Sequence, residues 1–295
     1  MVVLNPEKYM ELLPNKVREA LARVINVINE AFNNAWMPNK LSNAAYHYIR
    51  NKGKLIRPTL VLLTAYALSN SNGLERAVLP AASVEFIHMA SLLQDDIMDK
   101  QRIRRGVETP YNLYGENMAM LASDLMIAKA VELAVRSGDN DVVFELINSS
   151  IKLAIGQGLE LELNDRNYVT VNDYLKLIYY KTAALIESSM VVGAYSVNVK
   201  GEDLISNIRN VGRLVGLAFQ LRDDILDYFN VDKQNPGINN NEINIIKILS
   251  INSDIDNAVG TAKDMLNNML DEALNMVKKV LGDDVLINYI NLLRI

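Results

Sequence analysis

The chain has 295 residues, of which half are hydrophobic and 6% are aromatic, and its formal net charge is −5. It contains no cysteine, which excludes a disulfide framework and a cysteine metal site. The acidic balance argues against a nucleic-acid-binding surface. Only 14 glycines and 7 prolines interrupt a sequence rich in Leu, Ile, Ala and Met, and this composition favours long helices.

The first third of the chain has the periodicity of amphipathic helices. In NPEKYMELLPNKVREALARVINVINEAFN, apolar residues recur at helical spacing from Val17 to Ile28. The stretch RPTLVLLTAYALS follows, with Pro58 placed as a first-turn residue. The next segment, RAVLPAASVEFIHMASLLQDDIMD, is more apolar, and we predict that it forms a central helix.

Helical periodicity continues through most of the remaining chain. GENMAMLASDLMIAKAVELAVRSG begins and ends at glycines, and TVNDYLKLIYYKTAALIESS opens with a capping box at Thr170 and Asp173. The pattern breaks only at NVDKQNPGINNNEIN, which we interpret as a loop or flap because helical periodicity resumes after it. We find no strand alternation, so we predict one all-α domain over residues 1–295.

Neither a leader peptide nor a membrane span is predicted. The opening residues, MVVLNPEKYMELL, lack a basic start followed by a long apolar stretch. The longest apolar runs fall short of the ~18 residues that a membrane-spanning helix needs. We therefore expect a cytoplasmic protein without a transmembrane segment.

Two aspartate motifs carry the strongest chemical signal. They are DDIMD, with Asp95, Asp96 and Asp99, and DDILD, with Asp223, Asp224 and Asp227. The first and last aspartates of each motif are four residues apart, so on a helix they share a face and repel each other unless a cation lies between them. Oxygen ligands select a hard cation such as Mg²⁺. Two solvated helix faces are the alternative, but each motif follows an apolar helix, which disfavours it.

Basic side chains near these motifs suggest a polyanionic ligand. They are Lys54 and Arg57 in KGKLIRP, Arg104 and Arg105 after the first motif, and Lys181 beside Thr182 in YYKTA. Each one alone predicts a surface charge, but Mg²⁺ together with Arg and Lys is the chemistry that binds diphosphate. There is no P-loop and no GxGxxG motif, so we expect metal and cations to hold such a ligand.

Seven segments follow one another along the chain in this order: GKLIRP, EFIHMASLLQDDIMD, RRGVETPYNLYG, ASDLMIAKA, GQGLELEL, YYKTAALIESS and GLAFQLRDDILD. In this combination the sequence resembles the trans-isoprenyl diphosphate (polyprenyl) synthase family, of the geranylgeranyl or longer-chain type. The resemblance implies an all-α bundle around a deep central cavity, usually in a homodimer. It also implies head-to-tail condensation of isopentenyl diphosphate with an allylic diphosphate.

The same resemblance assigns roles to residues. It implies three Mg²⁺ ions, which Mn²⁺ can replace, with Asp95 and Asp99 binding two of them and Asp223 the third, while Asp96, Asp224 and Asp227 complete the motifs. The matched contacts of the allylic diphosphate are Arg104, Lys181 and Gln220, with Thr182 beside the reacting centre. The matched isopentenyl diphosphate site is Lys54, Arg57, His88 and Arg105. The released diphosphate can take the proton, so no dedicated general base is required.

The sequence departs from the family pattern after Asp227. Family members carry a GK and a later lysine there, whereas YFNVDKQNPGINNNEINIIKIL has no GK. Lys233 and Lys247 are the nearby candidates, so either one of them substitutes or the flap binds diphosphate less well. Gln94 and Ser123 stand where many members have His and Gly, and both are tolerable.

The residues before the first motif bear on product length. Ala90 and Ser91, one helical turn before Asp95, are small, whereas in this family a bulky aromatic there stops chain growth early. Ile87, one turn further back, is of moderate size, so we expect a linear all-trans product of C20 or longer. Two alternatives stay open: a floor on the facing helix, formed by Met118, Met120 and Met126, and small residues kept only for tight packing.

Two other functions compete with this one. A terpene cyclase or head-to-head synthase of similar fold usually keeps one strict DDxxD and lacks the isopentenyl site, whereas both are present here. A non-catalytic regulatory subunit of a heteromeric synthase is supported by the unusual flap. Such subunits typically lose aspartates, however, and none is missing here.

Overall fold

The computed structural model describes residues 6–33, 35–51, 53–69, 72–229 and 243–295. Within these ranges, the regular elements are helices apart from two short strands, β1 (Ile103–Arg104) and β2 (Val107–Glu108). The predicted all-α fold is therefore confirmed. The chain divides into two compact units, and each contains one of the two aspartate motifs.

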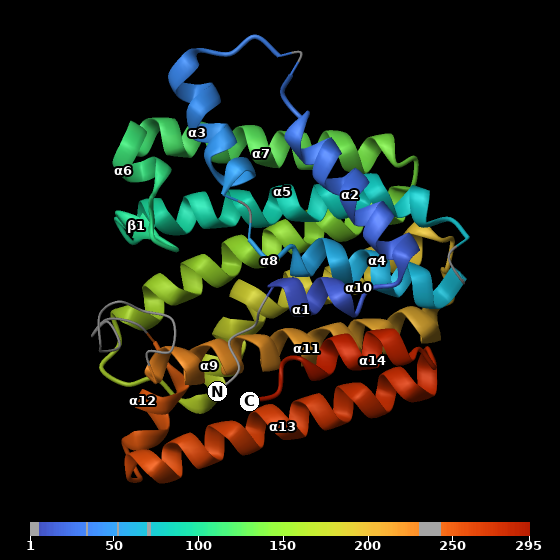
Figure 1. Cartoon of the computed structure of the whole chain (residues 1–295). Helices are drawn as coiled ribbons and strands as arrows, with labels where there is room; N and C mark the ends of the chain where they lie inside the picture. Colours follow the sequence, from blue (N-terminus) through green and yellow to red (C-terminus); the bar gives the residue numbers. More distant parts are fainter. Residues whose placement is uncertain (1–5, 34, 52, 70–71, 230–242) are drawn as a thin grey trace. The chain divides into compact units, whose positions relative to one another are not determined.

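The N-terminal unit comprises Asn15–Ile147 and Val192–Asn198. Its central element is α5 (Leu74–Met98), which contacts α2, α4 and α7 (Figure 1). Most α5 side chains are buried, so the predicted central place of this apolar segment is confirmed within the unit. The other helices of the unit are α2 (Asn15–Asn29), α3 (Asn39–Arg50), α4 (Ile56–Ser69), α6 (Pro110–Tyr114) and α7 (Glu116–Arg136).

The C-terminal unit comprises Met1–Pro14, Asn148–Val191 and Val199–Ile295. Its two longest helices, α11 (Glu202–Tyr228) and α13 (Ile255–Val280), pack against each other because α13 buries an apolar face. Helices α8 (Asn140–Asn164) and α10 (Ala184–Ser196) are divided between the units. The remaining elements are α1 (Pro6–Glu11), α9 (Val171–Ile178), the π-helical turn η1 (Tyr179–Ala183), α12 (Ile245–Ser250) and α14 (Asp284–Asn291).

Several helix ends lie where the sequence predicts them. The Thr170 side chain accepts a hydrogen bond from the Asp173 amide, and the Asp173 carboxylate accepts one from the Thr170 amide, which confirms the capping box at α9. Gly115 precedes α7 and Gly138 follows it, both with positive φ, as predicted for glycines at helix ends. Pro58 lies in the first turn of α4.

The β1–β2 hairpin is absent from the sequence prediction. Ile103 pairs with Glu108 and Arg104 with Val107, so Arg105 and Gly106 form a two-residue turn. Both turn residues have positive φ, at 54° and 76°, as the tightest hairpin turns require. Strands of two residues are too short to show alternation, which explains why periodicity missed them.

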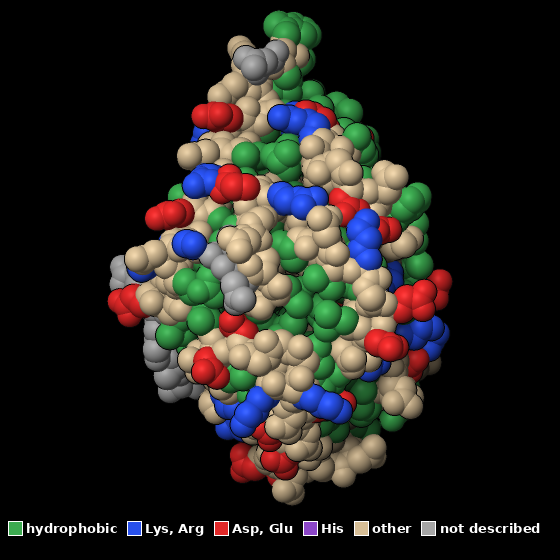
Figure 2. Space-filling model, turned by 90° about the vertical axis from the view of Figure 1, so that its right-hand side faces the viewer, with side chains coloured by type: hydrophobic (Ala, Val, Ile, Leu, Met, Phe, Trp, Pro, Cys, Tyr) green, Lys and Arg blue, Asp and Glu red, His purple; other side chains and the backbone are tan. Residues whose placement is uncertain are grey.

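Helix α5 is long and apolar enough to cross a membrane by composition alone. However, 72% of its most apolar window is buried inside the protein, as expected for a core helix. On the face drawn in Figure 2, Lys and Arg side chains are interspersed with Asp and Glu. A nucleic-acid-binding face concentrates basic residues instead, so this face gives no support to a nucleic-acid partner.

Candidate active site

The first motif lies at the end of α5, and its aspartates differ in exposure. Asp96 is fully buried, whereas Asp95 is partly exposed and Asp99 is exposed. The Tyr48 hydroxyl on α3 donates to Asp96 Oδ2, and Arg104 Nε donates to Asp96 Oδ1 at 2.7 Å. Both oxygens of the buried carboxylate are therefore hydrogen-bonded, as a charge removed from water requires.

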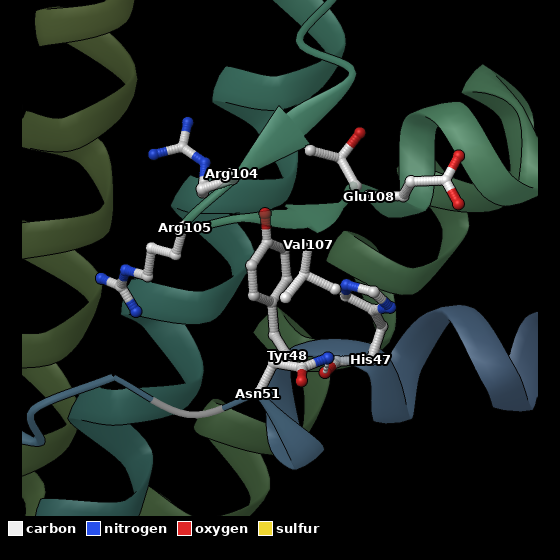
Figure 3. Close-up of a pocket in the computed structure, with 8 residues that line it drawn as sticks. His47, Tyr48, Asn51, Arg104, Arg105, Val107 and Glu108 are labelled. Carbon is white, nitrogen blue, oxygen red and sulfur yellow. Dashed lines mark hydrogen bonds between the residues drawn. The ribbon is translucent and has the colours of Figure 1, made fainter. Parts of the chain in front are cut away.

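A pocket of about 240 Å³ lies between α3 and the hairpin in the N-terminal unit (Figure 3). It is lined by His47, Tyr48, Asn51, Arg104, Arg105, Val107, Glu108 and Thr109. Burial lowers the pKa of His47, so the two arginines supply the positive charge of this lining. In Figure 3 both guanidinium groups extend away from His47.

Arg105 reaches back to the segment that precedes α4. A Cβ atom at position 53 would collide with Arg105 Nη1, so the guanidinium has room there because Gly53 has no side chain. Lys54, the next residue, is exposed. Two of the four residues assigned to the isopentenyl site, Lys54 and Arg105, thus lie on neighbouring parts of the N-terminal unit.

Arg57 and His88, the other two residues assigned to the isopentenyl diphosphate site, are in contact. Arg57 Nη1 lies 3.3 Å from His88 Nε2. Burial and the nearby Arg57 and Arg105 lower the pKa of His88 well below its ordinary value, so the ring is neutral and Nε2 accepts. Glu85 is buried one turn before His88. Burial raises its pKa to about 7, although Arg57 and Arg105 lower it.

The second motif, on α11 in the C-terminal unit, repeats the pattern of the first. Asp224 is buried, whereas Asp223 and Asp227 are partly exposed. The Tyr174 hydroxyl donates to Asp224 Oδ2 at 2.9 Å, and Gln220 Nε2 donates to Oδ1 at 2.8 Å. Burial raises the pKa of the Asp224 carboxyl to about 6, although these two hydrogen bonds lower it.

Asp224 also holds the start of α12. Its Oδ2 accepts from the Ile245 amide at 3.3 Å, and its backbone carbonyl accepts from Asn244 Nδ2 at 3.1 Å. Lys247 lies on this helix with its side chain partly exposed. Lys233, the other candidate for the missing flap lysine, lies outside the described residues.

Lys181 and Thr182 lie on the π-helical turn η1, a type of turn that occurs frequently at functional sites. The turn is closely packed, because a Cβ at Gly156 of α8 would lie 2.6 Å from the Lys181 amide nitrogen. Lys181 Nζ forms an ion pair with Glu160. Thr182 Oγ1 donates to Gln220 Oε1 at 2.8 Å, which connects Thr182 through Gln220 to the second motif.

Of the three predicted product-length residues in the N-terminal unit, two are buried and Ser91 is partly exposed. Ala90 and Ile87 are buried, and the Ala90 carbonyl accepts from Ser123 Oγ on α7 at 3.3 Å. Ser91 Oγ donates to the His88 carbonyl at 2.8 Å. Because α7 packs directly against Ala90, a large side chain there would intrude between the two helices.

The residues suggested as the alternative floor differ in exposure. Met126 is fully buried, Met118 is partly exposed and Met120 is half exposed. Of these three, Met126 is therefore the one placed entirely inside the protein.

Among the described residues, no three His, Cys, Asp or Glu side chains are close enough to hold a metal ion by themselves. Mg²⁺ usually keeps several waters and takes one or two carboxylates together with substrate phosphates. The first and last aspartates of each motif are accessible enough to fit that donor set, and Asp223 lies 3.7 Å from Arg222 Nη1. Asp96 and Asp224 are buried, with both side-chain oxygens hydrogen-bonded within the protein.

A sequence profile of the family described as Polyprenyl synthetase matches residues 38–280. The chain belongs to the polyprenyl synthetase family. The match includes both aspartate motifs and every residue assigned above to a metal or a diphosphate. The predicted resemblance is thereby confirmed.

Among relatives in the polyprenyl synthetase family is a short chain isoprenyl diphosphate synthase of Methanothermobacter thermautotrophicus. It is 38% identical over 224 residues, which cover 75% of this chain and 64% of that protein. A geranylfarnesyl diphosphate synthase of Aeropyrum pernix is 37% identical over 197 residues, which cover 64% of this chain and 62% of that protein. The chain thus spans less than two thirds of the length of these relatives.

The fold of a polyprenyl synthetase is also found in solved structures. The geranylgeranyl pyrophosphate synthetase of Pyrococcus horikoshii has a TM-score of 0.85 and 28% identity, covering 97% of this chain and 98% of that one. A decaprenyl diphosphate synthase of Rhodobacter capsulatus has a TM-score of 0.84 at 24% identity, covering 98% and 97% of the two chains. The latter identity supports the fold alone.

Several partners of the site residues were missed by sequence reasoning, among them Tyr48, Tyr174, Glu85 and Glu160. Tyr48 and Tyr174 lie 48 and 50 residues from the aspartates they contact, and a tyrosine in a helix carries no signal of such a contact. The sequence does give a signal for Glu85, because it is the one acidic residue inside the apolar run SVEFIHMAS. A carboxylate at such a position needs a nearby cation.

We expect Glu85→Gln to change how stability depends on pH. Between pH 4.5 and about 7 the folded state keeps a proton on Glu85 that the unfolded chain releases, so wild-type stability falls as pH rises through this window. In the variant, the free energy of unfolding no longer falls with pH through the titration of this side chain. The variant therefore gains stability relative to wild type as the pH approaches about 7. Urea unfolding across the window measures this, and Glu162→Gln, on an exposed part of α8, is the control that keeps the wild-type slope. Parallel curves for wild type and Glu85→Gln would contradict the prediction.

Proposed function

We propose that this chain is a trans-polyprenyl diphosphate synthase. It condenses isopentenyl diphosphate head-to-tail with an allylic diphosphate and makes a linear all-trans product of C20 or longer. The observation that carries the proposal is the family match over residues 38–280 together with two motifs whose outer aspartates are accessible and whose middle aspartates are buried. The relatives named as geranylfarnesyl and geranylgeranyl diphosphate synthases support the product class.

The donor chemistry of the motifs favours Mg²⁺, with Mn²⁺ as a substitute. Asp95 and Asp99 of the first motif and Asp223 and Asp227 of the second would hold it, with three ions per active site implied by the family. When bound, the metal draws charge from the leaving diphosphate and so favours ionisation of the allylic C–O bond. The aspartates themselves serve as oxygen donors on rigid helix ends.

The protein side chains bind and orient the two diphosphates. Arg104, Lys181 and Gln220 bind the allylic diphosphate, and Thr182 lies beside the reacting centre. Lys54, Arg57, His88 and Arg105 bind isopentenyl diphosphate. Because His88 is neutral and contacts Arg57, it acts as a hydrogen-bonding partner and not as a second cation. The released diphosphate takes the proton, and apolar walls exclude water from the cation.

Glu160 gives Lys181 a temporary partner. In the structure Lys181 is paired with this carboxylate, and both side chains are partly exposed. A diphosphate offers Lys181 more negative charge than a single carboxylate does. We infer that the lysine exchanges Glu160 for the substrate, while the π-turn keeps its backbone in place.

The competing functions gain no specific support. All six aspartates of the two motifs are present, which is against a silent regulatory subunit, and the isopentenyl-site residues are present, which is against a cyclase or head-to-head synthase. The family match spans both compact units, which supports one functional domain over residues 1–295. We propose the cytoplasm as its location.

We also propose a homodimer. Helix α8 carries an exposed apolar stripe, Phe144, Ile147, Ile151 and Ile155, and Val131 and Val135 of α7 are exposed as well. Spacings of three and four residues place the α8 stripe on one helix face. An apolar face of this kind on a soluble protein usually marks an association surface.

Substitution of the outer aspartates tests the reaction. We expect Asp95→Ala and Asp223→Ala each to lower turnover about a hundredfold or more, equivalent to ~2.7 kcal/mol of transition-state stabilisation. The assay combines purified protein, Mg²⁺, labelled isopentenyl diphosphate and each allylic primer, and products are sized by chromatography. Asp165→Ala, at an exposed acid outside the motifs, should keep the wild-type rate. Near-wild-type turnover in either motif variant would contradict the metal-binding role.

Product length is tested at Ala90. Because this buried residue lies against α7, we expect Ala90→Phe to shorten the product by at least one isoprene unit while activity survives. The same assay sizes the products, and Leu121→Phe, at an exposed position of α7 outside both candidate floors, should leave their length unchanged. A wild-type product of only C15, or an unchanged distribution in Ala90→Phe, would show that α5 does not set the length.

The dimer is tested by mass. The chain has a mass of 33.0 kDa, so light scattering should give about twice this value for wild type. We expect the double change Phe144→Glu and Ile151→Glu to yield monomers, because it places charges in the apolar stripe. Trp36→Glu, at a residue that is 90% exposed and does not belong to the stripe, should remain dimeric. A monomeric wild type would overturn the proposal.

A further inference from the structure

The middle aspartate is the buried member of both motifs, and in both it accepts a hydrogen bond from a buried tyrosine. Tyr48 contacts Asp96 in the N-terminal unit, and Tyr174 contacts Asp224 in the C-terminal unit. The two tyrosines come from different helices, α3 and α9. The same contact thus recurs in the two units.

The first of these contacts joins three elements that are distant in sequence. Tyr48 lies on α3, Asp96 on α5 and Arg104 on β1. Figure 3 shows the Tyr48 ring with its hydroxyl directed toward the strand that carries Arg104. Asp96 is fully buried and its two oxygens accept from Tyr48 and Arg104, so this carboxylate is turned into the protein.

Arg104 is held on two sides. Its Nε donates to Asp96 Oδ1 at 2.7 Å, and its Nη2 donates to Gln101 Oε1 at 3.3 Å. The backbone N–H of Gln101 in turn donates to the backbone carbonyl of Asp96 at 2.9 Å. A guanidinium has five N–H donors, so these contacts fix its plane and leave donors available for a ligand.

The hairpin that carries Arg104 has little structure of its own. Its strands have two residues each, and two strands alone are at best marginally stable. Among the contacts described for the hairpin, the Asp96–Arg104 ion pair attaches β1 directly to the end of α5. The direction of the Arg104 guanidinium therefore depends on where the Asp96 carboxylate points.

We propose that Tyr48 is a positioning residue: by holding one oxygen of Asp96, it directs the other oxygen to Arg104 and so orients the guanidinium for the allylic diphosphate. Asp96 on this view is a support for Arg104 and does not ligate the metal. The inference rests on the proposed function, because it assigns Arg104 to the diphosphate. It goes beyond that function in giving a role to Tyr48, a residue on α3 to which the proposed function assigns none.

Tyr48→Phe tests the proposal by removing only the hydroxyl. Without this hydroxyl the Asp96 carboxylate and the Arg104 guanidinium are no longer fixed, so we expect the KM for the allylic diphosphate to rise about tenfold or more. The KM for isopentenyl diphosphate and the Mg²⁺ concentration for half-maximal rate should stay at wild-type values. Tyr46→Phe is the matched control, because this tyrosine is on the same helix and its hydroxyl donates to Asn33 Oδ1 at 3.2 Å, away from the motif.

Asp96→Asn and Asp99→Asn separate support from metal ligation. We expect Asp99→Asn to raise the Mg²⁺ requirement, and Asp96→Asn to raise the KM for the allylic diphosphate with the Mg²⁺ requirement unchanged. A shift in Mg²⁺ requirement for Asp96→Asn as large as that for Asp99→Asn would overturn the proposal. So would a Tyr48→Phe variant that melts earlier but keeps both KM values.

A binding measurement keeps this inference separate from the proposed reaction. Titration of inorganic diphosphate with Mg²⁺ into wild type, Tyr48→Phe and Tyr46→Phe needs no turnover. If wild type binds diphosphate but transfers no prenyl group, the proposed reaction is wrong. The positioning role of Tyr48 is then decided by comparing the diphosphate affinities of wild type and Tyr48→Phe. Equal affinity in wild type and Tyr48→Phe overturns the positioning role, and a wild type that binds no diphosphate overturns both.

Discussion

The enclosure of carboxylates in an apolar helical core is the constraint on which the rest of this structure depends. Each buried carboxylate needs partners on its oxygens, since an unpaired charge removed from water is strongly destabilising. Asp96 obtains them from Tyr48 and Arg104 on other elements, and Asp224 obtains them from Tyr174 on α9 and from Gln220 on its own helix. Glu187 obtains them from Lys152 and Arg209, at 3.0 and 2.9 Å. Charged side chains thus connect helices that share no backbone hydrogen bonds.

This constraint explains why the two motifs behave alike although they lie in different units. In a DDxxD pattern at the end of a buried helix, the first and last aspartates share a face and the middle one points elsewhere. In both units that other direction is the protein interior. The outer pair is then the more accessible to a cation, while the buried middle residue ties the motif to its surroundings. One short pattern therefore supplies both a ligand pair and its support.

The helices and both motifs could be predicted from sequence because they rest on local periodicity, as in α5, and on caps, as at Thr170. The assignment of site residues rests on the order of the motifs and stays a prediction, and most of the partners of these residues could not be predicted. The Tyr48–Asp96 contact depends on where α3 packs, which no local pattern records. The strands of the hairpin at Arg104 are too short to show an alternation of apolar and polar residues. The π-turn at Lys181 has the composition of an ordinary helix.

Gly53 illustrates how folding and chemistry can make separate demands on one position. A side chain there would meet the flexible end of Arg105 and no backbone atom among its nearest contacts, so the fold could accept it by letting the guanidinium swing aside. A library selected for solubility or heat resistance would therefore retain substitutions at Gly53 that misdirect Arg105. Positions 53 and 105 form a coupled pair, and redesign of either one has to treat the other as a variable.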